Sequence, residues 1–220
     1  ALMTMDAARK LLGAGFTSAC SAASAKIRLD VAVRDAIERG ETDGPRLLAA
    51  SPELTVTGGL GDGRRLHLHQ DSFGVAVDGP DEVRRMARLC LREGCDTIKL
   101  NISGDVGTES ALAEATVMTD AEVAAGVEAA HTAGRRVAAH ARASESVKRA
   151  LRHGVDIIYH CDFADAEALD MLEAARDRIF TGPVVPPFIR PYVHHVRLPL
   201  DVALMRREAA ALKGVHDFRA

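Results

Sequence analysis

The sequence predicts an α/β fold in which parallel strands alternate with helices. Short apolar segments of β-branched or small residues recur between segments with helical periodicity. Three of them follow a turn or helix-end signal, namely Glu93-Gly94, Ala133-Gly134 and His153-Gly154. Such segments are typical of strands buried in a parallel sheet. For 220 residues, a single domain over 1–220 is the simplest organisation.

Six strands are expected, and right-handed crossovers could join them all in one parallel sheet. The strands are predicted at 16–20, 46–50, 96–99, 136–140, 156–160 and 178–181. Residues 51–79 contain several glycines and no clear periodicity, so a long loop is expected there.

Helices are predicted where apolar residues recur at helical spacing between start and stop signals. Pro80 suits a first helical position and Gly94 ends the same helix. Thr119-Asp120-Ala121-Glu122 is a capping box, in which the hydroxyl and the carboxylate each satisfy an orphan amide. The expected helices cover 4–12, 27–37, 80–93, 119–130, 144–152, 165–175 and 200–212.

Composition excludes several classes of protein. Apolar residues make up 47% and charged residues 27%, which argues against a mainly disordered chain. A net charge of −3 argues against nucleic acid as a partner, and no apolar run approaches the roughly 20 residues of a membrane span. The four cysteines form no CxxC pair, so a reducing cytoplasm is expected. The chain starts at Ala1 and directly with a helical pattern, which is compatible with truncation or processing.

Three residues that can bind a metal lie at or near the ends of consecutive predicted strands: Lys99, His140 and His160. Chemistry collects at the carboxyl ends of strands in α/β sheets and barrels, and imidazole is the commonest neutral metal ligand. Alone, such a Lys is more often an ion-pair partner and such a His a hydrogen-bonded core residue. Three together are harder to explain by packing. Tyr159 should point away from His160, as neighbours on a strand do.

Seven segments, in their order and spacing, resemble the amidohydrolase superfamily, above all its imidazolonepropionase-like and prolidase-like branch. The resemblance runs from about Ala7 to Thr181. The segments are Gly15-Phe16-Thr17-Ser18, Asp43 to Ala50, Thr57-Gly58-Gly59, Thr97-Ile98-Lys99, Val127 to His131, Gly134 to Ala141 and Gly154 to His160.

The resemblance implies a (β/α)8 TIM-like barrel, of which this chain holds family strands two to seven. It further implies one or two divalent metals, usually zinc. Lys99 matches a lysine that is carboxylated and bridges two metals, and His140 and His160 match ligands of the second metal. A metal-activated hydroxide would then cleave a C–N bond in an amide, urea, carbamate or dipeptide-like substrate.

The departures from the family pattern matter as well. The family has a His-x-His pair on strand one and an Asp on strand eight that acts as general acid/base, and neither strand is found here. His67 and His69 have the spacing of the pair but lie in the predicted loop, which favours a pocket-wall, substrate-binding or solvated-loop role over metal ligation. Asp217 follows a predicted helix, where a frayed terminus is the simpler interpretation. Arg142 could bind a substrate carboxylate or be solvated, as could His194 and His195.

Two further hypotheses stay open beside the C–N hydrolase. The same metal-bound hydroxide would serve a lactonase or phosphotriesterase. Alternatively, the chain is a non-catalytic fragment or subunit that needs a partner chain to complete its site. The expected partners are a small-molecule substrate and either further copies of this chain or the segments missing here.

Overall fold

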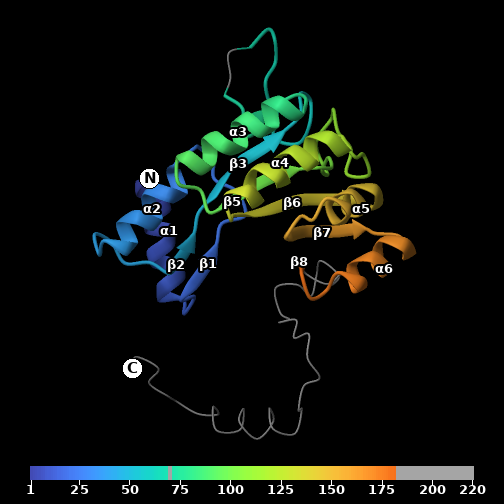
Figure 1. The fold of residues 1–220 in the computed structure, drawn as a ribbon. Coiled ribbons are helices and arrows are strands. Elements are labelled where there is room, and N and C mark those ends of the chain that lie inside the picture. The colour runs from blue at the N-terminus through green and yellow to red at the C-terminus, as the bar shows by residue number, and fades with distance from the viewer. Residues whose placement is uncertain (69–70, 182–220) are drawn as a thin grey trace, which may run out of the picture. The chain divides into compact units, whose positions relative to one another are not determined.

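Parallel strands joined by helices frame the described part of the chain, residues 1–68 and 71–181 of a computed structural model (Figure 1). The elements in order are α1 (Leu2–Gly13), β1 (Ser18–Cys20), α2 (Leu29–Glu38), β2 (Arg46–Leu48), β3 (Ala50–Thr55), β4 (Val75–Ala76), α3 (Pro80–Arg92), β5 (Thr97–Asn101), α4 (Asp120–Thr132), β6 (Arg136–Ala143), α5 (Ser144–Arg152), β7 (Ile157–Phe163), α6 (Ala166–Ala174) and β8 (Phe180–Thr181). The expected α/β alternation is confirmed.

The main sheet has six strands in the order β4-β3-β5-β6-β7-β8, while β1 pairs only with β2. Every pair is parallel. The prediction of one sheet is therefore wrong for the two amino-terminal strands. The expected helix 200–212, the pair His194 and His195, and Asp217 lie outside the described residues.

The predicted loop over 51–79 is also wrong at its start, because β3 occupies Ala50–Thr55 in the main sheet. Pro52 argued against a strand here at the level of sequence, because proline has no amide hydrogen to donate to a neighbouring strand. The register with β5 shifts between Ala50 and Glu53, which accommodates the proline. At that point the Lys99 amide donates to Ser51 Oγ, at 2.9 Å. A buried serine hydroxyl thus replaces a backbone acceptor.

The sheet separates an apolar side from a polar one. Side chains of Ile98, Leu100, Val137 and Ile158 are fully buried in the hydrophobic core that the sheet shares with the helices. Gly126 of α4 permits a close approach, because a Cβ there would lie 3.1 Å from a Leu100 methyl group. The alternate residues of the same strands face the other way, and they form the candidate site.

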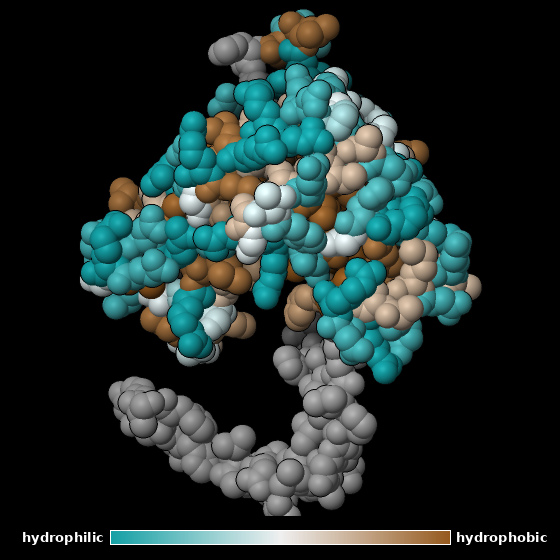
Figure 2. Space-filling view, in the orientation of Figure 1, coloured by the Kyte–Doolittle hydropathy of each residue, from teal (hydrophilic) through white to brown (hydrophobic). Residues whose placement is uncertain are grey.

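The space-filling view shows a largely hydrophilic face with apolar atoms at the tip of the loop that joins β3 to β4 (Figure 2). Leu66, Leu68 and Phe73 of this loop are exposed. None of the described helices is long and apolar enough to cross a membrane.

Asp96 fixes the point at which β5 begins. Its side chain is 12% exposed and accepts hydrogen bonds from the Ala49 amide at 3.0 Å and from Arg34 at 2.5 Å. Arg135 donates to its other oxygen at 3.1 Å. The carboxylate thus joins α2, the β2–β3 junction and the turn before β6 to the start of β5.

We expect Asp96→Ala to lower the free energy of unfolding by about 3 kcal/mol, because it leaves the half-buried Arg34 guanidinium without one of its carboxylates. Asp81→Ala is the matched control, since Asp81 is 98% exposed and its removal should cost less than about 1 kcal/mol. Urea unfolding of both variants measures the difference. Equal losses would show that Asp96 does not anchor the strand.

Candidate active site

Strand register places a row of polar side chains on the face of the main sheet opposite the hydrophobic core. This face is called the inner face below. Lys99 of β5 lies beside Glu53 of β3, and Asn101 lies beside His140 of β6. His140 in turn lies beside Tyr159 of β7. Residues paired in this way point to the same face, as do residues two apart on one strand. Lys99 and His140 therefore lie on the same face of the sheet, as the sequence predicted. Both strands continue beyond these residues, so neither residue is the last of its strand.

Lys99 carries an almost fully buried amine, since the residue is 3% exposed. Its Nζ donates to Asn101 Oδ1 at 3.2 Å and lies 5.4 Å from the centre of the Tyr159 ring. Burial lowers the pKa of Lys99 to about 8, against the opposing attraction of Glu53 and Asp105. The amine therefore loses its proton far more readily than a solvated lysine does.

His160 reaches the site through a left-handed turn in the backbone. In a regular strand it would point to the opposite face from Tyr159, but His160 and Cys161 have φ angles of 77° and 60°. The register between β6 and β7 also shifts just beyond, between Ala141 and Ala143. As a result the His140 and His160 ring centres lie 4.5 Å apart.

The expectation that Tyr159 points away from His160 is wrong, because the left-handed backbone turns the His160 ring toward Tyr159, and the two ring centres lie 6.4 Å apart. Pairing with His140 places the Tyr159 ring on the same face as the Lys99 amine. Positive φ angles at two successive residues with side chains are strained, and such strain collects at functional sites.

His140 is held in one neutral form. Its Nε2 lies 2.9 Å from the Gly104 carbonyl, which can only accept, so Nε2 carries the hydrogen and Nδ1 keeps a lone pair. Burial lowers the pKa of His140 to about 4. Burial, together with the positive charge of Arg142, likewise lowers the pKa of His160 to about 4. Both rings are therefore neutral near pH 7, as metal ligation requires.

The residues fit a divalent metal by their protonation states but form an incomplete ligand set. Within 1–68 and 71–181, no group of three His, Cys, Asp or Glu side chains is placed to hold a metal. Two imidazoles and a lysine meet here, and an ammonium cannot ligate a cation. An amine as easily deprotonated as Lys99 can become a ligand once it is carboxylated.

Arg142 is engaged by carboxylates. Its Nε lies 2.8 Å from an oxygen of Asp105, and its Nη1 donates to Asp162. Asp105 also lies 3.8 Å from His140 Nε2. The guanidinium therefore fastens the loop after β5 to the end of β7 beside both histidines. A substrate contact by Arg142 stays a prediction, and it would require competition with these ion pairs.

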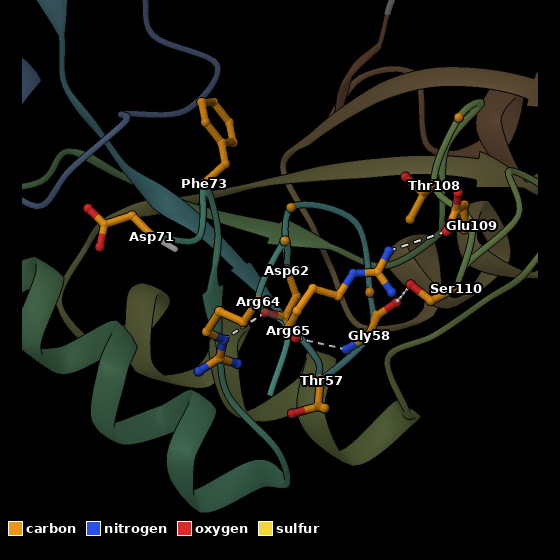
Figure 3. A pocket seen from close by; sticks show the side chains of 14 residues that line it. Thr57, Gly58, Asp62, Arg64, Arg65, Asp71, Phe73, Thr108, Glu109 and Ser110 are labelled. Atoms are coloured by element: carbon orange, nitrogen blue, oxygen red, sulfur yellow. Dashed lines mark hydrogen bonds and ion pairs between the residues drawn. The ribbon is translucent and has the colours of Figure 1, made fainter. Parts of the chain in front are cut away.

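A pocket of about 690 Å³ opens between the loop after β3 and the loop after β5 (Figure 3). Its charged lining side chains are paired: Arg64 with Asp62 at 2.7 Å, Arg65 with Glu109 at 3.2 Å, and Asp71 with Lys26, which is not a lining residue, at 3.2 Å. Phe73 supplies an aromatic wall. His67 is exposed in a turn and is not among the lining residues, and His69 lies outside the described part of the chain.

Three polar residues of the site were missed from the sequence: Glu53, Asn101 and Asp105. One signal was available for Asn101. The run Thr97-Ile98-Lys99-Leu100-Asn101 alternates polar and apolar residues, which places Lys99 and Asn101 on one face of a strand. Glu53 was not predicted because Pro52 made its strand look like a loop. Asp105 was not predicted because it lies in an irregular loop, where no periodicity gives the direction of a side chain.

The metal-free protein should lose stability as the pH falls from about 6.5 to about 4. In this window the unfolded chain protonates His140 at its ordinary pKa, whereas the folded chain does not. His140→Asn should therefore flatten the slope of unfolding free energy against pH, by on the order of 2 kcal/mol over the window. His67→Asn, in the exposed turn, serves as the control and should keep the wild-type slope. A slope unchanged by His140→Asn would contradict the buried neutral imidazole.

Comparison with known proteins identifies the family. Residues 1–177 match the amidohydrolase family. An ochratoxinase from Aspergillus niger is 28% identical over 157 residues, which cover 64% of this chain and 33% of that protein. A solved Xaa-Pro dipeptidase with bound methionine in the active site is 32% identical, with a TM-score of 0.70 over 79% of this chain and 43% of that one. A solved amidohydrolase is 30% identical, with a TM-score of 0.73 over 82% and 45%.

This chain thus spans less than half the length of the relatives it matches. The likeness of the structures confirms the predicted TIM-like barrel, of which the described parallel sheet is a part. The chain belongs to the amidohydrolase family.

Proposed function

We propose that this chain contributes to a metal-dependent hydrolase that cleaves a C–N bond in an amide, urea, carbamate or dipeptide-like substrate. One observation carries the proposal: a buried, readily deprotonated Lys99 amine shares the inner face of an amidohydrolase barrel with two neutral imidazoles. The relatives support the reaction class, since ochratoxinase, a Xaa-Pro dipeptidase and other amidohydrolases are among them.

In this proposal Lys99, His140 and His160 hold one or two divalent ions, most simply zinc. A bound ion would lower the pKa of a water molecule and polarise the substrate carbonyl. The part played by Lys99 follows from its environment. Its neutral amine adds to carbon dioxide, so that an N–C bond forms and one proton leaves, and the resulting carbamate offers oxygen donors.

The histidines and their partners supply orientation. The Gly104 carbonyl fixes the tautomer of His140 and leaves its Nδ1 free to donate a lone pair. Arg142 and Asp105 hold the loop that carries this carbonyl. The pocket in Figure 3 is the proposed entry for a small-molecule substrate, because its wall at Gly61 adjoins Glu53 beside Lys99.

Metal analysis tests the proposal directly. The intact, purified protein should contain zinc or bind it in the presence of bicarbonate, and Lys99→Ala should lose bound metal and hydrolase activity by at least about 100-fold. Lys10→Ala is the matched control, because Lys10 is 76% exposed and forms a surface ion pair with Asp6 of the same helix. A zinc-to-protein ratio near zero, unchanged by added metal and bicarbonate, would overturn the metal-dependent function.

Substrate panels separate the reaction classes that the ligands alone leave open. Amides, ureas and dipeptides should be hydrolysed in preference to lactones and phosphotriesters. The opposite preference would favour the lactonase or phosphotriesterase hypothesis. Both outcomes are read from the same metal-loaded preparation.

We further propose that the site is completed by polypeptide other than the described residues. The supporting observation is the ligand set, which within 1–68 and 71–181 stops at two imidazoles and one lysine. A homo-oligomer is one source, and the exposed Leu66 and Leu68 offer it an apolar contact. Intact mass of the active assembly distinguishes the sources. A single 23.5 kDa species with hydrolase activity would exclude a required partner chain.

A cytoplasmic location is likewise proposed. Its support is that the four cysteines of the sequence form no CxxC pair, and that Cys20, Cys90 and Cys95 form no disulfide with one another. Disulfides are rare in reducing compartments.

A further inference from the structure

Asn101 is a completely buried polar side chain whose hydrogen bonds join three separate parts of the molecule. Its Oδ1 accepts from Lys99 Nζ at 3.2 Å, and its Nδ2 donates to Glu53 Oε2 and to the Leu60 carbonyl, each at 3.0 Å. The residue is 0% exposed. Lys99 belongs to β5, Glu53 to β3 and Leu60 to the loop beyond β3.

The amide of Asn101 can satisfy these partners in one orientation only. A carboxylate and a carbonyl accept hydrogen bonds, so they must face the NH2 group, while the protonated lysine amine only donates and must face the oxygen. Register supports the same arrangement, because Asn101 is two residues beyond Lys99 on one strand and Glu53 pairs with Lys99 across the sheet. All three side chains therefore share the inner face.

The loop that accepts from Asn101 rests directly on Glu53. Gly61 has a φ angle of 89°, and a Cβ there would lie 2.9 Å from Glu53 Oε2. Its carbonyl accepts from the Gly74 amide at 2.7 Å. No side chain fits between the loop and the carboxylate, so the backbone around Gly61 packs against the site. Figure 3 shows the same loop as the wall of the pocket.

We propose that Asn101 is a positioning residue that couples the pocket wall to Lys99. Its carbonyl oxygen directs the Lys99 amine, and its NH2 group fastens both Glu53 and the loop at 58–62, so substrate binding at the wall and the placement of Lys99 depend on one amide. The inference rests on the proposed function only in taking Lys99 as a metal-binding residue. The coupling between loop and strand stands on the hydrogen bonds alone.

Two variants separate the functions of the two ends of the amide. Asn101→Ala removes both, whereas Asn101→Asp keeps an oxygen for Lys99 but replaces the NH2 group by an oxygen that faces the Glu53 carboxylate. Hydrogen exchange of the Gly59 and Asp62 amides reports on the loop, since both amides are bonded within it. Zinc affinity in the presence of bicarbonate reports on Lys99.

Asn101→Ala should speed exchange at these amides by about tenfold and weaken zinc binding by about tenfold or more. Asn101→Asp should speed exchange to a similar extent, with a smaller loss of zinc affinity. Ser110→Ala is the control, because Ser110 Oγ donates to the Gly58 carbonyl at 2.5 Å from the other side of the pocket. It should speed exchange in the loop but weaken zinc binding less than Asn101→Ala does, because the Asn101 oxygen still directs the Lys99 amine.

Exchange at Gly59 and Asp62 that stays at the wild-type rate in both Asn101 variants would overturn the coupling, whatever the metal content. Failure of the intact, purified protein, with any partner chain in place, to bind zinc would overturn the proposed function, and the exchange measurement would still decide the coupling. A loss of zinc affinity in Ser110→Ala as large as in Asn101→Ala would show that the loop acts without Asn101. Urea unfolding of each variant confirms that exchange is compared between folded proteins.

Discussion

The register of the parallel strands is the constraint on which the rest of the structure depends. It directs Lys99, Asn101 and His140 to the inner face and their apolar neighbours Ile98 and Leu100 to the helices. A slip of one residue would exchange the two sets, leaving a lysine amine in the hydrophobic core and isoleucine in the site. Anchors at the strand starts, such as Asp96 on the Ala49 amide, have a role well beyond local stability because they oppose such a slip.

In this site, burial of the side chains determines their protonation states and hence their reactivity. Removing Lys99, His140 and His160 from water disfavours their charged forms, so the fold itself keeps the imidazoles neutral and the amine easy to deprotonate. The free-energy cost of burying these polar groups is limited because they have hydrogen-bond partners: Asn101 for Lys99 and the Gly104 carbonyl for His140. Reactivity and hydrogen-bond satisfaction therefore have to be considered together, and Asn101 and Gly104 contribute to both.

Local signals in the sequence predicted much of the fold, but they could not predict contacts between residues that are far apart in the chain. Pro80 and the capping box at Thr119 mark helix starts because each acts within a single turn. The strands carrying Lys99 and His140 were likewise evident from short apolar runs. Glu53 was not, because its neighbour Lys99 is 46 positions away in the chain and only the register reveals the pair. The left-handed backbone at His160 has no residue signature at all, since glycine is absent there.

The inner face of the main sheet leaves one requirement for stability and another for function. Beneath Tyr159 lies a cavity of about 420 Å³, lined in part by Cys20, Leu48 and Ile157, and Phe180 at its rim is 68% exposed. The interior of a (β/α)8 barrel is filled by side chains, so the described residues leave apolar surface for further polypeptide to cover. The cavity adjoins the first residues of β5, β6, β7 and β8, which are Thr97, Arg136, Ile157 and Phe180. His140 and His160 lie farther along their strands, so covering this apolar surface and completing the ligand set are separate requirements on the same face of the main sheet.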